Sequence, residues 1–154
     1  MTISVRAAKT HDVAQLVAFN MAMAAESEDK GLDAGILRNG IRAVLDDPTH
    51  GLYLVAQIRG HSVGALMVTF EWSDWRNGRF WWIQSVFVSK GHRRQGVYRA
   101  LHDHVRALAK GDQTSCGIRL YVERDNTGAQ ATYDAVGMRE TAYRLFEEEW
   151  SRRP

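Results

Sequence analysis

The chain has 154 residues, of which 45% are hydrophobic and 25% charged, as in a soluble globular protein with enough material for one core. Two prolines and 13 scattered glycines leave no linker-like stretch, so we expect a single domain over residues 1–154. The net charge of +2, from 20 Lys and Arg against 18 Asp and Glu, supplies no broad basic surface for nucleic acid.

The cysteine content and the length of the apolar runs limit which classes of protein remain possible. Cys116 is the only cysteine, which excludes an intrachain disulfide and a multi-cysteine metal site. The apolar runs are far shorter than the roughly 18 residues of a membrane-spanning helix, and the first residues lack the apolar core of a secretory signal. We therefore expect a cytoplasmic protein with no metal, no membrane partner and no nucleic-acid partner. Nothing in the sequence fixes the oligomeric state, and a homodimer stays open.

The chain begins with a predicted strand and two predicted helices. Ile3 and Val5 alternate with polar residues, which is typical of a short strand. Thr10 can cap a helix, because the apolar residues after it recur at helical spacing. A second helix is predicted between Asp33, which can cap it, and Pro48, since the residue before a proline avoids helical geometry.

Three strands are predicted in the middle of the chain. Residues 52–58, 63–70 and 80–88 have the composition of strands. Asn77-Gly78 supplies the turn chemistry between the second strand and the third. This region is therefore predicted to form an antiparallel meander.

The last third of the chain alternates helices and strands. Apolar residues return to helical spacing over 97–110, and a strand is expected at 118–122. Because a helix separates this strand from the preceding one, the two are expected to be parallel neighbours. A last helix ends at Gly137, and residues 142–150 are predicted to form a closing strand. The order β-α-α-β-β-β-α-β-α-β predicts an α/β fold, with a mixed, mostly antiparallel central sheet of about six to seven strands flanked by about four helices.

The segment over residues 86–101 carries the most informative pattern. A predicted strand ends at Val88, residues 89–96 form a turn rich in Lys, His and Arg, and a predicted helix follows. The first N–H groups of a helix have no intrahelical acceptor and carry partial positive charge, and a glycine such as Gly96 lets backbone approach a phosphate. The pattern therefore suits a pyrophosphate. The alternative is that the basic side chains only solvate a surface turn.

Residues 60–64 match the hydrolase pattern G-x-S-x-G, with Ser62 as nucleophile and His92, His102 and His104 downstream. That motif works only at a sharp turn from a strand into a helix. Because a strand continues after Ser62, a β-hairpin is favoured and a serine hydrolase is the alternative. His102 and His104 lie two residues apart on a predicted helix, so they do not form the i,i+4 pair that binds zinc, and both are expected at the surface.

Two further groups are assigned structural roles. Trp72, Trp75, Trp81 and Trp82 are expected in the core, because aromatic residues on strands are more often buried than exposed. No basic stripe interleaves with them to bind single-stranded nucleic acid. Residues 147–149, all glutamates, are expected to line an edge strand, where like charges discourage aggregation.

Two sequence blocks can be compared with family signatures. The first is the run Arg93-Arg94-Gln95-Gly96-Val97-Tyr98 after a central strand. The second is Leu120-x-Val122 followed by Asn126-x-x-Ala129-x-x-x-Tyr133-x-x-x-Gly137-Met138. They resemble the patterns Gln/Arg-x-x-Gly-x-Gly/Ala and L-x-V…N-x-x-A-x-x-x-Y-x-x-x-G-F of the GNAT superfamily, which are acyl-CoA-dependent N-acyltransferases. With the same order of elements, the resemblance covers most of the chain.

The resemblance implies a binding site for acyl-CoA. The strand ending at Val88 and the strand at 118–122 would diverge, with acyl-CoA in the gap. Backbone groups of the first strand would bind the pantetheine arm, and backbone N–H groups after it would bind the pyrophosphate. Tyr98, which departs from the small residue of the family, would add bulk beside the phosphates. The residues implied to bind the cofactor are Val86, Phe87, Val88, Arg93, Arg94, Gln95, Gly96, Val97, Tyr98, Arg99 and Asn126.

The resemblance also implies a reaction, the transfer of an acetyl group from acetyl-CoA to a primary amine on a small molecule or a peptide. The amine would attack the thioester directly in a ternary complex, without an acyl-enzyme. Tyr133 would donate a proton to the departing thiolate, because the phenol pKa of about 10 lies near that of a thiol.

The general base is where the sequence departs most from the family. Many members have a glutamate on the strand before the loop, whereas this chain has Gln84, which does not take up a proton. Glu71 is the first candidate for the base, followed by Asp74 and Glu123. Gln84 also keeps open a non-catalytic acyl-CoA sensor as an alternative to the transferase.

Overall fold

The computed structural model describes residues 1–27 and 31–150. The chain divides into two compact units, Met1–Tyr121 and Val122–Pro154, and each is described by itself. The helices and strands of the first unit are β1 (Ile3–Ala7), α1 (Val13–Ser27), α2 (Ala34–Asp46), β2 (Leu52–Ile58), β3 (His61–Ser73), β4 (Gly78–Val88), α3 (Val97–Gly111) and β5 (Ser115–Arg119). The second unit contains α4 (Thr127–Ala135).

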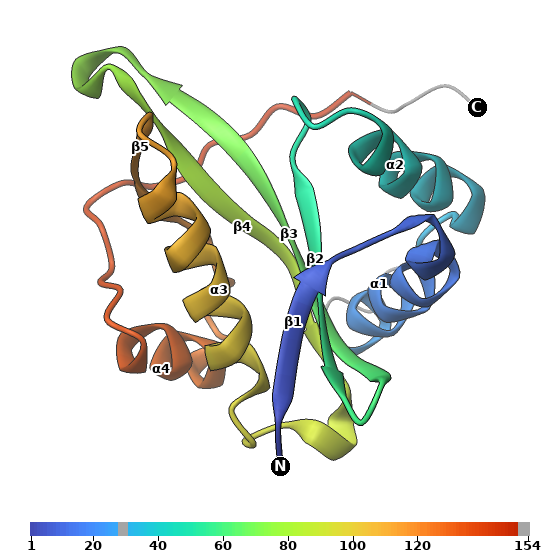
Figure 1. Cartoon of the computed structure of the whole chain (residues 1–154). Helices are drawn as coiled ribbons and strands as arrows, with labels where there is room; N and C mark the ends of the chain where they lie inside the picture. Colours follow the sequence, from blue (N-terminus) through green and yellow to red (C-terminus); the bar gives the residue numbers. More distant parts are fainter. Residues whose placement is uncertain (28–30, 151–154) are drawn as a thin grey trace. The chain divides into compact units, whose positions relative to one another are not determined.

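The strands form one sheet in the order β1-β2-β3-β4-β5 (Figure 1). Neighbouring strands are antiparallel, except that β4 and β5 are parallel and are joined through α3. The predicted meander and the predicted parallel crossover are both confirmed. The mixed α/β class, with four α-helices in the described residues, is confirmed as well.

The sheet has five strands in the described residues instead of the expected six to seven. The strand expected at 118–122 is β5, which begins three residues earlier and ends at Arg119. Residues 142–150, expected to close the sheet, have no regular secondary structure. A strand-like sequence becomes a strand only when it finds an edge to pair with, so the expected final β-strand is absent from the observed order.

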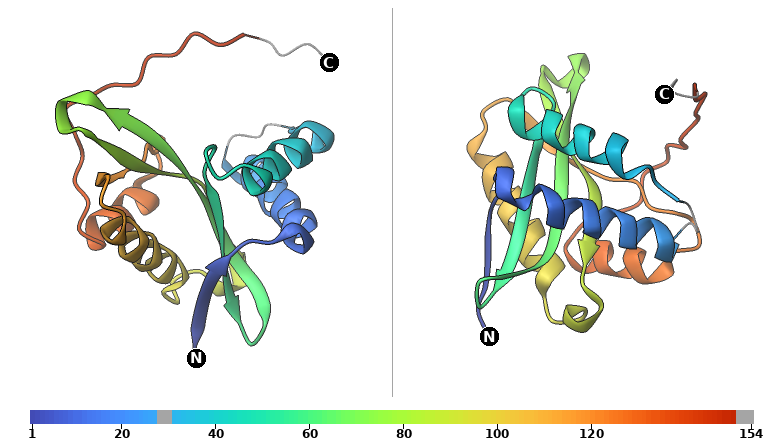
Figure 2. Two further views of the ribbon diagram at one scale, coloured as in Figure 1. Left: turned by 45° about the horizontal axis from the view of Figure 1, so that its top comes forward. Right: turned by 90° about the vertical axis from the view of Figure 1, so that its right-hand side faces the viewer.

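Helices cover both faces of the sheet in the first unit (Figure 2). α1 and α2 pack on one face and α3 packs on the other. The apolar stripes of the helices explain this packing, since Leu16 of α1 and Leu101 and Val105 of α3 are at most 1% exposed. Each such side chain contributes roughly 1.5–3 kcal/mol by burial. The middle strands are thus enclosed between two helical layers.

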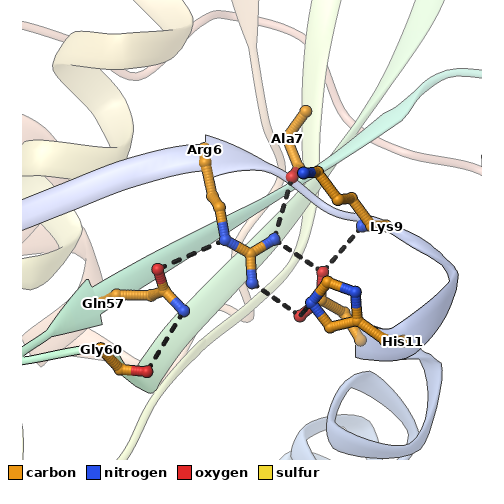
Figure 3. Close-up of polar contacts among 7 residues, drawn as sticks. Arg6, Ala7, Lys9, His11, Gln57 and Gly60 are labelled. Atoms are coloured by element: carbon orange, nitrogen blue, oxygen red, sulfur yellow. Dashed lines mark hydrogen bonds and ion pairs between the residues drawn. The ribbon is translucent and has the colours of Figure 1, made fainter.

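The junction between β1 and α1 is fixed by an ion pair (Figure 3). Arg6 donates from Nη1 and Nη2 to the two carboxylate oxygens of Asp12, at 2.7 and 2.8 Å. The same carboxylate accepts the backbone N–H of Lys9 at 2.7 Å, so it closes the short 3-10 turn that precedes α1. The cap predicted at Thr10 is therefore wrong, because Thr10 is the first residue of this 3-10 turn and Lys9 precedes it. The hydrogen bond from Arg6 lowers the pKa of Asp12 below its ordinary value.

The start of α2 agrees with the sequence. Asp33 precedes the helix, and its Oδ1 accepts the N–H of Ile36 at 2.9 Å. α2 ends at Asp46, two residues before Pro48. The cap and the end predicted for this helix are both confirmed.

The tryptophans are less buried than predicted. Trp81 is 5% exposed and lies in the core, and Trp82 is partly buried. Trp72 and Trp75 are 60% and 89% exposed, so their predicted core position is wrong. They lie where the β3–β4 hairpin reaches its 3-10 turn, Asp74–Arg76. No helix in the described part of the chain is long and apolar enough to cross a membrane.

Candidate active site

The pairing between β4 and β5 ends partway along β4. Their last pair in register is Trp82 with Arg119, where β5 ends, whereas β4 continues to Val88. Over residues 83–88, the ladder between the described strands joins β4 only to β3. The other edge of β4 over these residues, called the open edge below, therefore has no strand partner among the described residues. The ladder thus ends before Val88, and the divergence of the two strands implied by the resemblance stays a prediction.

A β-bulge bends this open edge. Gln84 pairs with Met67 and Phe87 pairs with Ala65, so β4 has one more residue than β3 between the two pairs. Within the bulge, Ser85 has a φ of +53°, a left-handed conformation that is uncommon for a residue other than glycine. A bulge of this kind re-aims the strand edge and its side chains.

A buried hydroxyl supports the bulge. The Tyr53 side chain is 3% exposed, and its hydroxyl is hydrogen-bonded to Ser85. Asn20 donates to the same hydroxyl from Nδ2 at 3.3 Å. Burial raises the pKa of Tyr53, so the phenol stays neutral. No sequence pattern signals this arrangement, because the three residues belong to α1, β2 and β4.

After β4 the chain turns sharply into α3. The N–H of Ser89 donates to the carbonyl of Val63 at 2.8 Å, and a 3-10 turn, Lys90–His92, follows. Arg94 and Gly96 have left-handed φ values of +61° and +85°. Alternating backbone conformations of this kind, followed by a helix start, aim consecutive N–H groups toward one side. A Cβ on Gly96 would meet no described atom within 4 Å, so there is open space beside it.

Arg93 uses its side chain to hold this loop in place. Its Nε donates to the carbonyl oxygen of Val88 at 2.8 Å, and its Nη2 donates to Oε2 of Glu26 at 2.7 Å. Its guanidinium also lies 5.7 Å from the ring centroid of Phe87. Sequence reasoning assigned Arg93 only a backbone role and missed this brace, because Glu26 lies 67 residues earlier in the chain.

Tyr98 is buried in α3. Its side chain is 9% exposed, and its hydroxyl lies 3.0 Å from Nδ1 of His102. The expected bulk of Tyr98 beside the phosphates stays a prediction. The surface position predicted for His102 is wrong, since this residue is 1% exposed. Burial lowers the pKa of His102 below its ordinary value.

Glu71 lies toward the far end of β3. It pairs with Phe80, which is six residues before Val86, roughly 20 Å along an extended strand. One of its oxygens accepts a hydrogen bond from Nη1 of Arg119 at 2.8 Å. Glu71 therefore lies on the sheet, far from the end of β4 at Val88 where the loop begins.

Ser62 lies in a hairpin. β3 already includes Ser62, which pairs with Gln57 of β2, and the turn between these strands has left-handed residues at Arg59 and Gly60. The chain does not enter a helix at this point, so the geometry that G-x-S-x-G requires is missing. The predicted β-hairpin is confirmed.

The second unit carries the two remaining site residues. Asn126 caps α4, because its Oδ1 accepts the N–H of Ala129 at 3.1 Å. Tyr133 lies in the same helix and is partly buried. Burial raises the pKa of its phenol above the ordinary value, so the hydroxyl keeps its proton at neutral and mildly alkaline pH.

The comparison with family models decides the identity of the fold. The model of the acetyltransferase (GNAT) family matches residues 18–138. The chain belongs to the GNAT acetyltransferase family. It is therefore an acyltransferase, as the two sequence blocks indicate. Among curated proteins, none matches the chain.

Solved structures agree with this assignment. A possible acetyltransferase from Clostridium difficile 630 is 39% identical, with a TM-score of 0.89 over 99% of this chain and 100% of that chain. A predicted acetyltransferase from Clostridium acetobutylicum, solved with acetyl-CoA, is 17% identical, with a TM-score of 0.79 over 96% of each chain. AAC(6')-Iy, solved with a bisubstrate analogue, is 16% identical, with a TM-score of 0.76 over 98% of this chain and 100% of that chain. The last two share the fold.

In this GNAT acetyltransferase, the first unit offers two neighbouring sets of backbone groups. One set is the open edge of β4, and the other is the loop that leads from Val88 into α3. An extended chain of amides fits a strand edge, and a phosphate group fits the N–H groups at a helix start. The two sets follow each other directly in the sequence.

Proposed function

We propose that this protein transfers the acetyl group of acetyl-CoA to a primary amine of a small molecule or a peptide, by direct attack in a ternary complex. The observation that carries the proposal is the open edge of β4, which leads without interruption into a glycine-containing loop and a helix start. The acetyl-CoA in the Clostridium acetobutylicum structure and the CoA-containing analogue on AAC(6')-Iy support the same ligand class.

Binding in this proposal is mostly by backbone. The open edge at Val86, Phe87 and Val88 pairs with the pantetheine amides, and the N–H groups over residues 93–99 hold the pyrophosphate. The open space beside Gly96 leaves room for phosphate oxygens close to the backbone. Asn126, whose side-chain oxygen caps α4, is also proposed to bind the cofactor.

The chemical step needs an oxyanion donor and an acid. The neutral amine attacks the thioester carbonyl, and a backbone N–H near Val88 stabilises the oxygen as it gains negative charge. The carbon–sulfur bond then breaks, and Tyr133 gives its proton to the departing thiolate. The raised pKa of Tyr133 keeps this proton available at the working pH. The products are the acetylated amine and free CoA.

The amine must lose a proton before or during attack, because a lysine-type amine with a pKa near 10.4 is mostly charged at neutral pH. Gln84 does not accept this proton from the amine, and its Nε2 donates a hydrogen bond to the hydroxyl of Thr69. Water at the amine takes the proton first, and Glu71 is proposed as the carboxylate to which it is finally passed, because the roughly 20 Å along the strand between Glu71 and Val86 excludes direct contact. Its ion pair with Arg119 fixes the position of the carboxylate.

The proposal is tested by measuring free thiol during incubation with acetyl-CoA and a panel of primary amines. The panel covers polyamines, amino sugars, peptide N-termini and lysine peptides. We expect thiol release that depends on one class of amine and yields an equal amount of acetylated product. Binding of acetyl-CoA without thiol release for any amine would instead support the non-catalytic sensor that Gln84 keeps open.

A further inference from the structure

A cavity of about 510 Å³ lies at the end of the sheet where β1 begins. Its walls come mainly from the β2–β3 hairpin and from the loop that follows β4, which Figures 1 and 2 show at the same end of the sheet. Pockets for small organic molecules commonly measure about 300–1,000 Å³, so this cavity is large enough for one. The lining residues used in the argument are Ile58, Arg59, Val63, His92 and Gln95.

The cavity lies on the opposite side of β4 from the open edge. The open edge is on the β5 side of β4, whereas the hairpin belongs to β2 and β3, which lie on the other side in the order β1-β2-β3-β4-β5. β4 therefore separates the cavity from the edge proposed for the pantetheine arm. Gln95 lines the cavity and also belongs to the loop proposed to hold the pyrophosphate, so the two sites are neighbours.

Two of the lining side chains are apolar and belong to the core. Ile58 ends β2 and Val63 lies in β3, and they are 8% and 3% exposed. The sheet holds both in fixed positions, so this wall is formed before a ligand arrives. The carbon atoms of a ligand that lie against this wall leave water, which favours a ligand with an apolar body.

One polar atom of a lining residue lacks a partner. Nδ1 of His92 is buried and has no hydrogen-bond partner among the described residues. A buried nitrogen in this state is uncommon in folded proteins, because leaving it unsatisfied costs free energy. The backbone N–H of His92 donates to the carbonyl of Ser89 at 2.8 Å, so the 3-10 turn holds this residue in place. The missing partner of Nδ1 is therefore expected from a ligand in the cavity.

The charge of the walls favours an anion. Arg59 lines the cavity and is exposed at the tip of the hairpin. None of the lining residues in the described part of the chain is an aspartate or a glutamate. A guanidinium binds a carboxylate through two parallel N–H groups, and a protonated Nδ1 of His92 is a further donor. One arginine beside an apolar wall suits a ligand with a single negative charge.

We propose that this cavity binds a small monocarboxylate with a compact apolar body, such as an aryl or a branched aliphatic acid. The carboxylate is bound by Arg59 and Nδ1 of His92, and the apolar body lies against Ile58 and Val63. The site gives a role to the buried Nδ1, which the transfer of the acetyl group does not use. Binding of this ligand does not depend on the proposed reaction.

The first test is a titration of the native protein with phenylacetate, followed by NMR of the backbone amide and imidazole nitrogens. We expect saturable shifts over residues 58–63 and 91–95, with a change at Nδ1 of His92. Phenylacetamide has the same shape without the charge, and acetate lacks the ring, so each should bind at least about 10-fold more weakly. No saturable shift with phenylacetate at millimolar concentration, or equal affinity for phenylacetamide, would overturn the proposal.

The second test uses variants of the two polar groups. Arg59→Gln should weaken the binding of phenylacetate about 10-fold and leave that of phenylacetamide nearly unchanged, because only the charged partner is lost. His92→Phe keeps a ring and removes Nδ1, and it should weaken binding about 5-fold. Arg42→Gln removes the same charge from an exposed position on α2 and should have native affinity. Native affinity for phenylacetate in Arg59→Gln or His92→Phe would overturn the proposal.

The last test repeats the titration of the native protein with CoA present at saturation. Because the two sites lie on opposite sides of β4, the affinity for phenylacetate should stay within about 3-fold of its value without CoA. Displacement of phenylacetate by CoA would show that the cavity belongs to the CoA site, and it would overturn the proposal. The first two tests contain no CoA, so a protein that fails to bind CoA leaves their outcome unaffected.

Discussion

Nε of Arg93 donates to the carbonyl oxygen of Val88 at 2.8 Å, which ties the loop back to the end of the strand it leaves. The same guanidinium reaches Glu26 of α1 at 2.7 Å. One side chain therefore sets the position of the loop against both the sheet and the first helix. A phosphate site made of backbone groups depends on such a brace, because its donors have no side-chain freedom with which to adjust.

Arg93→Ala should weaken the binding of acetyl-CoA about 10-fold, or about 1.4 kcal/mol, because the loop loses a charge-assisted hydrogen bond. Lys90→Ala is the control. Nζ of Lys90 lies 3.9 Å from Oε1 of Glu26, and the Lys90 side chain is 76% exposed. Its loss should therefore change the affinity for acetyl-CoA by no more than about 2-fold. Calorimetric titration of both variants measures the difference. Equal losses would mean that charge near the loop matters and the bond to Val88 does not.

Tyr133→Phe should lower kcat about 100-fold and leave the affinity for acetyl-CoA nearly unchanged, because only the proton donor is lost. In the native enzyme, burial raises the pKa of this phenol, so the fall of kcat that follows its deprotonation should lie above pH 10. That fall should be missing from the variant. Tyr143→Phe provides the control for loss of a hydroxyl, and it should have native kcat. A native kcat in Tyr133→Phe would show that Tyr133 has a packing role and does not donate the proton.

Glu71→Gln should lower kcat/KM at pH 7 by about 100-fold, the lower end of typical effects for a general base. The loss should shrink as the pH rises toward the amine pKa near 10.4, because the acceptor is then already neutral. Asp74→Asn, three residues further on, removes an exposed carboxylate and serves as control. If Asp74→Asn shows the deficit and Glu71→Gln does not, the base has been assigned to the wrong carboxylate.

Asp12→Asn should destabilise the fold by about 3 kcal/mol, because it leaves the buried side of the Arg6 guanidinium without its partner. The folded-state pKa of Asp12 is lowered, so its contribution is present above its ordinary value of 3.8 and is lost as the pH falls through the folded-state pKa. Denaturant unfolding at pH 7 and at pH 3 measures both effects. Asp103→Asn breaks an exposed pair with Arg106 and should cost less than about 1 kcal/mol. A similar cost for both variants would contradict the assigned role of Asp12.

Local patterns predicted most elements of the first unit. The stripe of α3, the cap at Asp33 and the turn at Asn77-Gly78 depend on residues close in sequence, and each has a strong preference for one conformation. The same holds for the loop between Val88 and α3, while the anion site expected there stays a prediction. These features could be predicted because their causes lie within a few residues.

Features that depend on distant residues could not be predicted. The brace between Arg93 and Glu26 and the support of Ser85 by Tyr53 join elements far apart in the chain. The burial of His102 depends on how α3 packs, and a polar residue one position from the apolar stripe gives no local sign of it. The missing strand at 142–150 has the same cause, because pairing requires an edge that local sequence does not specify.

The central claim is that the loop between Val88 and α3 binds the diphosphate of CoA through its backbone, and calorimetry on a pair of glycine variants tests it most directly. Gly96→Val puts a side chain into the open space at a left-handed residue, whereas a Cβ at Gly91 also meets no described atom within 4 Å and needs no unusual φ. We expect the native protein and Gly91→Val to bind CoA with similar affinity, and Gly96→Val to lose binding by about 10-fold or more. Native affinity in a folded Gly96→Val protein, or no binding of CoA to the native chain at millimolar concentration, would contradict the claim.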